Sequence, residues 1–171
     1  ATLREDVVAM RRRMRAELDR SDASRFDLKQ GEGGLVDLEF LLQQRVLALS
    51  SMHPSLCAHA ATRELIGALA AVDGLHGSDA QALLRAHAAL LARGLDCTLD
   101  RRPRLCVPVA ALDQARAVVR QACLAQGLHG EQAVQQGGVG FARAKHGGGK
   151  LGCVVIGALF TRADIRARGQ R

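Results

Sequence analysis

The sequence predicts a mainly α protein: a helical bundle of about five helices with one short extended element and a glycine-rich, basic tail. Three observations predict this class. Apolar residues make up 48% of the chain but aromatic residues only 2%, so the core must consist of leucine, alanine and valine. Only three prolines interrupt the chain, which favours helices. Its 171 residues suit one ordinary domain. Apolar residues also recur at spacings of three and four in several separate stretches.

Five stretches carry this helical spacing, at about residues 4–20, 35–50, 59–72, 78–91 and 110–125. In the first, Val7, Met10 and Met14 recur among four arginines, which is typical of an amphipathic helix. Arg93-Gly94 suits the end of the fourth, and residues 95–108 are expected to be irregular. Phe26–Lys29 is expected to form a short extended element, which could fray without a sheet to join.

The net charge of +7 is concentrated at the C-terminal end of the chain. Residues 1–128 hold 17 lysines and arginines against 15 acidic residues, whereas residues 129–171 hold seven against two. This tail is glycine-rich and lacks helical periodicity, so we expect it to be disordered. Its GGGK is not a Walker loop, because Ala144 and Leu151 occupy positions that need glycine and a hydroxyl residue.

Cysteine use and apolar run length indicate a cytoplasmic protein. The five cysteines are scattered without a CxxC pair, which favours free thiols in a reducing compartment over disulfides or a zinc site. No apolar run reaches the roughly 18 residues of a membrane span, and the start of the sequence does not resemble a signal peptide.

The stretch FDLKQGEGGLVDLEF, residues 26–40, departs most from ordinary helical sequence. Gly31, Gly33 and Gly34 allow a sharp turn and close approach of a ligand, and the following helix start suits an anion. Lys29 adds a positive charge. The alternative is that the glycines only turn the chain into a helix, and spacing alone favours that alternative.

Asp37 and Glu39 are not expected to form a metal-binding or acid–base pair. The leucine spacing places both on a helix, where residues i and i+2 point about 200° apart. One of them could still face a site while the other caps the helix or pairs with an arginine. The histidines form no ligand cluster, and there is no GxSxG nucleophile motif.

Two segments together resemble a known family. MRRRMRAEL (residues 10–18) followed by FDLKQGEGGLVDLEFLLQ (residues 26–43) is similar to the adenylylating half of bacterial glutamine synthetase adenylyltransferase, also called glutamate–ammonia-ligase adenylyltransferase. That family carries an arginine-rich MRxEL helix, then FDLKxGxGGLxDIEFLxQ, then a helical bundle. The resemblance covers roughly residues 4–128 and finds no counterpart for the tail.

The resemblance implies a nucleotidyltransferase that moves AMP from ATP to a tyrosine of glutamine synthetase. It implies magnesium and ATP as cofactors, and glutamine synthetase and the PII signal protein as partners in regulating nitrogen assimilation. Residues 1–34 would be the end of a nucleotidyltransferase α/β domain, 35–128 a helical bundle domain and 129–171 a tail. The family's metal-binding G-S-x-x-D-x-D motif is not found in the sequence, so the chain alone is expected to be inactive, with no metal site of its own.

Site residues follow from this resemblance. Lys29, Gly31, Gly33 and Gly34 are the candidate nucleotide-binding residues. The candidate supporting residues are Arg15, Asp27, Asp37 and Glu39.

Two rival functions remain open. The bundle could be a non-catalytic interaction or regulatory module that docks glutamine synthetase or PII. The weaker rival is a basic nucleic-acid binder. Its binding should be nonspecific, salt-sensitive and lost on truncation after Leu128, because the basic charge lies in the tail and arginines do not alternate with aromatic residues.

Overall fold

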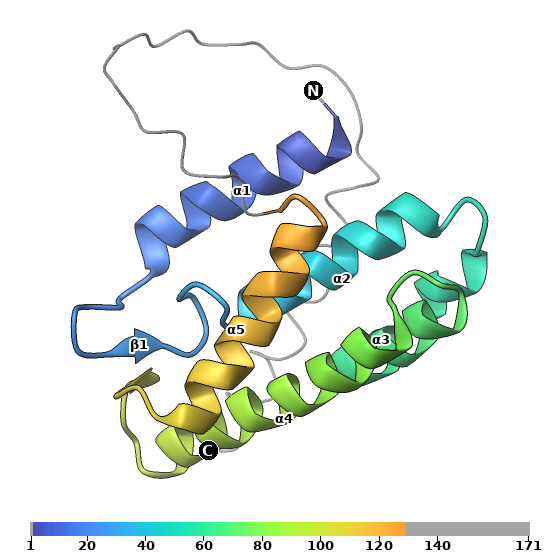
Figure 1. Cartoon of the computed structure of the whole chain (residues 1–171). Helices are drawn as coiled ribbons and strands as arrows, with labels where there is room; N and C mark the ends of the chain where they lie inside the picture. Colours follow the sequence, from blue (N-terminus) through green and yellow to red (C-terminus); the bar gives the residue numbers. More distant parts are fainter. Residues whose placement is uncertain (1, 129–171) are drawn as a thin grey trace, which may run out of the picture. The chain divides into compact units, whose positions relative to one another are not determined.

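The computed structural model describes residues 2–128, which lie within the compact unit Ala1–Ala133 (Figure 1). This part is mainly helical, as predicted, with five α-helices, one 3₁₀ helix and a two-stranded sheet. The elements follow in chain order: α1 (Leu3–Leu18), β1 (Phe26–Asp27), α2 (Leu35–Leu49), η1 (Pro54–Ala58), α3 (Thr62–Ala71), α4 (Gly77–Leu99), β2 (Leu105–Cys106) and α5 (Ala110–Ala125). None of these helices is long and apolar enough to cross a membrane.

Helix α2 is the centre of the bundle, because it contacts each of the other four α-helices. Helices α4 and α5 pack along each other beside it (Figure 1). The core is built mainly from aliphatic side chains, as the composition predicts, with two phenylalanines and three cysteines among them. Its fully buried members include Leu28, Leu38, Leu41, Leu42, Ile66, Leu69, Leu83, Leu90 and Val119.

Helix α1 contacts the bundle through α2. Its start is fixed by a capping box, in which the Thr2 hydroxyl accepts from the Glu5 backbone N–H and the Glu5 carboxylate accepts from the Thr2 N–H. The buried residues of α1 are Val7 and Arg11, whereas Leu18 is exposed. An arginine therefore lies on the face where the apolar spacing suggests only aliphatic packing.

The expected end of the fourth helix near Arg93-Gly94 is wrong, because α4 continues to Leu99. Leu90 and Cys97 are both completely buried and lie on the same side of the helix as Gly94. Burying this face outweighs the roughly 1 kcal/mol by which an interior glycine disfavours a helix. The third helix also begins later than expected, after the 3₁₀ helix.

The expectation that residues 95–108 are wholly irregular is also wrong. Leu105–Cys106 forms β2, which pairs antiparallel with β1 so that Phe26 faces Cys106 and Asp27 faces Leu105. The short extended element thus has a strand partner, and the paired residues are 80 and 78 positions apart in the chain. The ladder is extended by the Leu28 N–H, which donates to the Arg104 carbonyl at 2.9 Å.

The proposed division at residues 34 and 35 stays a prediction. The tail, residues 129–171, and with it the expected disorder, lies outside the described residues.

Candidate functional site

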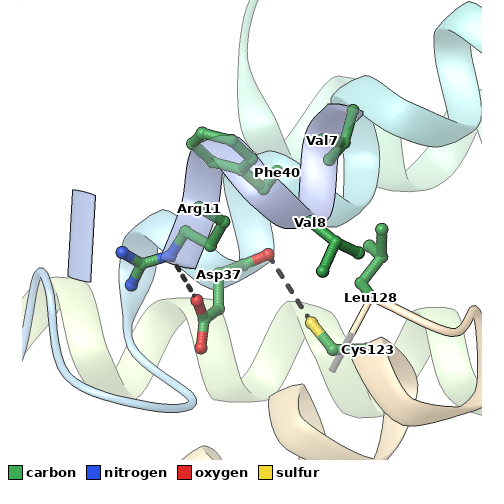
Figure 2. A pocket seen from close by; sticks show the side chains of 7 residues that line it. All are labelled: Val7, Val8, Arg11, Asp37, Phe40, Cys123 and Leu128. Atoms are coloured by element: carbon green, nitrogen blue, oxygen red, sulfur yellow. Dashed lines mark hydrogen bonds and ion pairs between the residues drawn. The ribbon is translucent and has the colours of Figure 1, made fainter. Parts of the chain in front are cut away.

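A buried ion cluster joins the first turn of α2 to α1. Asp37 lies in that first turn, and its side chain has no exposed surface. One carboxylate oxygen accepts from Arg11 Nε at 2.6 Å, and Arg15 Nη2 donates to both oxygens at 2.9 and 2.8 Å. Figure 2 shows the Arg11–Asp37 pair between the two helices. The carboxylate therefore binds two arginines that stand one helical turn apart on α1.

The same cluster closes the glycine stretch. The Gly33 backbone N–H donates to the second Asp37 oxygen at 2.7 Å. Arg11 Nη2 also donates to the Gln30 carbonyl at 2.7 Å. Asp37 thus provides the negative charge that favours a helix N-terminus, and Arg11 fixes the loop that precedes the helix.

Two arginines and one carboxylate leave this cluster with an excess positive charge. The Arg11 and Asp37 side chains are almost completely buried, whereas the Arg15 side chain is 27% exposed. Arg15 Nε is buried and has no hydrogen-bond partner among the described residues. Arg15 is therefore the member of the cluster that retains both access to solvent and an unused donor.

The three glycines lie where larger residues would collide. A Cβ on Gly31 would stand 2.4 Å from the Phe26 ring, and one on Gly34 would stand 2.8 Å from the Leu28 carbonyl. Gly33 has a φ of +77°, and a Cβ there would stand 2.5 Å from the Arg116 carbonyl. The glycine stretch is consequently packed against β1 on one side and α5 on the other.

Asp27 holds the beginning of this loop. Its Oδ1 accepts from the backbone N–H groups of Lys29 and Gln30, both at 2.9 Å, and its own N–H donates to the Ser21 hydroxyl. The Asp27 carbonyl accepts from the Gly31 N–H. This pattern of side-chain and backbone bonds is a turn that Asp27 organises.

Glu39 lies in different surroundings from Asp37. It is half-buried and forms none of the ion pairs among residues 2–128. Burial raises the pKa of the Glu39 carboxyl group, while attraction to Lys29 and Arg11 acts in the opposite direction. The two carboxylates therefore do not converge on one ion, as the helical spacing predicts, and the one that pairs with arginine is Asp37.

A small pocket lies beside the ion cluster (Figure 2). Aliphatic, aromatic and sulfur-containing side chains surround the Arg11–Asp37 pair; the lining residues are Val7, Val8, Arg11, Asp37, Phe40, Cys123 and Leu128. The Cys123 thiol donates to the Asp37 backbone carbonyl at 3.7 Å. Burial, followed by the nearby Asp37 charge, strongly raises the pKa of this thiol, so Cys123 is a packing group here and not a thiolate.

The sequence interpretation named Arg15, Asp27 and Asp37 but missed Arg11 and Arg116. The Arg116 guanidinium lies 3.7 Å from the centre of the Phe26 ring, which holds the loop from the side of α5. Arg11 could have been found from its position four residues before Arg15, because this spacing places both side chains on one face of the helix. No local pattern indicates Arg116, which is far from the loop in sequence.

The backbone N–H groups of all three glycines have partners within the protein. Gly31 donates to Asp27, Gly33 to Asp37 and Gly34 to the Gly31 carbonyl. Both Asp37 oxygens are likewise engaged by cations, so this carboxylate does not fit the open coordination that magnesium needs. Within residues 2–128, no three histidine, cysteine or acidic side chains are grouped to hold a metal ion. Nucleotide binding by Lys29 and the glycines stays a prediction.

Comparisons with known proteins identify the class to which this fold and ion cluster belong. The family model described as GlnD PII-uridylyltransferase matches residues 6–96, and the chain belongs to this family. The matched range contains most of α1, the glycine stretch, α2, α3 and most of α4.

Individual relatives carry a more particular name. The chain is 56% identical over 128 residues to the bifunctional glutamine synthetase adenylyltransferase/adenylyl-removing enzyme of Xanthomonas axonopodis pv. citri, and 57% identical over 123 residues to that of Stenotrophomonas maltophilia. A Nitrosococcus oceani protein of the same name is 40% identical over 87 residues. These findings confirm the resemblance read from residues 10–18 and 26–43.

The chain corresponds to a small part of these relatives. The match covers 75% of this chain but 14% of the Xanthomonas protein, and 72% of this chain but 13% of the Stenotrophomonas protein.

Proposed function

We propose that this chain is a segment of a protein that transfers AMP from ATP to a tyrosine of glutamine synthetase and thereby regulates nitrogen assimilation. The observation that carries the proposal is the Asp37 cluster, which joins the two segments of the resemblance, MRRRMRAEL and the glycine stretch, into one structure. High identity to relatives with that printed name supports it.

The proposed role of the segment is to support the nucleotide pocket. Since the glycine N–H groups are used internally, the side chains of Lys29 and Arg15 are the groups we propose to face the phosphates of ATP. Lys29 is placed by the turn that Asp27 organises, and Arg15 is placed by Asp37. A cation held in position in this way stabilises phosphate charge without rearranging during the reaction.

Magnesium, ATP, PII and a cytoplasmic location belong to this proposal for the longer protein. The chemistry magnesium would supply is positioning of the phosphates and neutralisation of the charge that develops during transfer. The chain's own proposed contribution is the positive charge of Lys29 and Arg15 beside that centre.

A chimera tests the proposal. The matching segment of the Xanthomonas relative is replaced by this chain, and AMP transfer to glutamine synthetase is measured with and without the substitution Lys29→Ala. We expect a rise in KM for ATP of tenfold or more. Lys29→Arg should recover part of it, because the charge is retained. Arg25→Ala is the matched control, since Arg25 is an exposed cation of the same region that pairs with Asp22.

The outcomes separate the parts of the proposal. Unchanged ATP kinetics in the Lys29→Ala chimera would contradict the role of Lys29. A folded chimera that fails to transfer AMP even with the unsubstituted chain would contradict the assignment of the segment itself.

A row of exposed leucines favours a second candidate function, a docking module for glutamine synthetase without chemistry of its own. Leu91, Leu95 and Leu99 follow each other at four-residue spacing on α4 and are 43%, 54% and 80% exposed. Such a row is typical of a helix face that packs against a partner. Pull-down of glutamine synthetase by the chain should then be lost with Leu95→Glu and retained with Leu18→Glu on α1, which replaces a leucine that is 45% exposed.

A further inference from the structure

Two buried cysteines from different elements meet at the end of α4. Cys97 lies in the last turns of α4 and Cys106 in β2, and their sulfur atoms are 3.6 Å apart with one thiol donating to the other. Both are free thiols with 0% and 3% exposure. The other two described cysteines differ from this pair. The Cys123 thiol donates to the Asp37 backbone carbonyl, and Cys57 is exposed.

We propose that Cys97 and Cys106 are a site of oxidation, at which a peroxide produces a disulfide that fastens β2 to α4. In the first step one thiolate attacks a peroxide oxygen; the O–O bond breaks and a sulfenic acid forms. The other oxygen leaves as hydroxide, which takes up the proton released by the thiol and becomes water. In the second step the neighbouring thiol attacks that sulfur; the S–S bond forms, the S–O bond breaks, and a second water leaves. The two thiols together lose two protons and two electrons, which reduce hydrogen peroxide to two waters.

The position of the pair gives the disulfide a structural consequence. Cys106 stands opposite Phe26 in the β1–β2 ladder, and the Phe26 ring fills the space beside Gly31. A ladder of two residue pairs is weak by itself, so β2 can separate from β1 at small cost. A covalent link from Cys106 to α4 would hold β2 in place and, through Phe26, hold the base of the glycine stretch.

Access and protonation set the speed of the reaction. Burial raises the pKa of Cys97, the hydrogen bond from Cys106 raises it further, and Arg102 and Arg93 act in the opposite direction. The thiolate is the attacking form, so oxidation should accelerate as the pH rises above neutrality. Access of peroxide requires brief opening at β2, which the short β1–β2 ladder allows at small cost.

Peptide mapping of the full chain tests the proposal. The substitutions Cys57→Ser and Cys153→Ser remove the exposed cysteine and the cysteine of the tail. The protein is treated with hydrogen peroxide, remaining thiols are alkylated, and trypsin is added. Cleavage after Arg93, Arg101, Arg104 and Arg116 places the two cysteines in separate peptides, 94–101 and 105–116. We expect these peptides to be joined, with the mass of the pair lower by two hydrogens, and Cys123 to be alkylated only after unfolding.

Hydrogen exchange provides the second measurement. The Leu28 N–H, which donates to the Arg104 carbonyl, should exchange at least tenfold more slowly in the oxidised protein than in the reduced one. Cys97→Ala should abolish both the joined peptides and the slowing. Peptides joined through Cys123, an absence of joined peptides in the folded protein, or joined peptides with unchanged exchange would each overturn the proposal.

Discussion

The backbone N–H of Gly33 donates to the carboxylate of Asp37 at 2.7 Å, so the glycine stretch is closed by a charge from the helix that it precedes. Arg11 and Arg15 bring two positive charges from α1 to the same carboxylate. One side chain therefore places a negative charge in the first turn of α2, holds the loop before it and fastens α1 to the bundle.

Replacing Asp37 with asparagine should cost about 3–5 kcal/mol of unfolding free energy, because Arg11 would keep its charge in a buried position without a counterion. Chemical denaturation of the full chain measures this change. Asp22→Asn is the control, since Asp22 and Arg25 form an exposed pair, and it should leave the denaturation midpoint unchanged. Equal small effects of the two substitutions would show that the buried cluster does not stabilise the fold.

Alanine substitutions at two glycines should change stability in opposite directions. Gly33→Ala should destabilise by more than about 1 kcal/mol, because its φ is +77° and the new Cβ would meet the Arg116 carbonyl. Gly94→Ala should stabilise by about 0.4–1 kcal/mol, because the position is helical and an added Cβ meets nothing within 4 Å. Thermal unfolding of both variants checks the pair, and a loss of stability in Gly94→Ala would contradict the packing described for α4.

Stability should fall with rising pH in a window set by Glu39. Burial raises the pKa of Glu39 in the folded protein above its unfolded value, so the unfolded chain releases this proton first. The folded state then binds more protons than the unfolded state, and its stability decreases from the ordinary glutamate pKa up to the raised one.

Glu39→Gln should remove this part of the pH dependence and raise stability above the window. The measurement is the denaturation midpoint at a series of pH values that starts below the ordinary pKa of glutamate and rises through neutrality. Glu64→Gln is the control, because the Glu64 side chain is 61% exposed. If both variants keep the slope of the original chain, Glu39 does not titrate as described.

The chain alone should not transfer AMP to glutamine synthetase in the presence of magnesium. Asp37, the most deeply buried of the candidate carboxylates, has both oxygens occupied by arginines and by Gly33, and Glu39 does not share its surroundings. Transfer of label from α-labelled ATP is measured beside a circular dichroism spectrum, with the chimera as the positive control. Clear transfer by the purified chain would contradict this prediction.

Much of the fold could be predicted from sequence because the apolar spacing is a local signal. Leu38, Leu42 and the residues around them show the central helix plainly, and the fifth expected helix, 110–125, agrees with α5. The end of α4 could not be predicted locally. Gly94 resembles a helix terminus, but burial of Leu90 and Cys97 against other elements decides that the helix continues.

The candidate site also has some features that the sequence predicts and others that only the packing decides. Its glycine stretch and the divergence of Asp37 from Glu39 follow from sequence alone, since helical geometry separates neighbouring positions. The choice of Asp37 as the buried partner of Arg11 depends on how α1 packs on α2.

The sequence by itself determined that this protein is a helical bundle with a glycine-rich turn before its central helix, because composition, periodicity and turn residues act over a few positions. Two segments of the sequence, residues 10–18 and 26–43, were also sufficient to indicate the family. Only the tertiary structure decided that Phe26 pairs with Cys106, that Arg11 is buried on Asp37 and that Cys97 meets Cys106. These contacts join residues far apart in the chain or on different elements. They are selected once the helices pack, because apolar rings and sulfur atoms are then buried and the buried charges are paired.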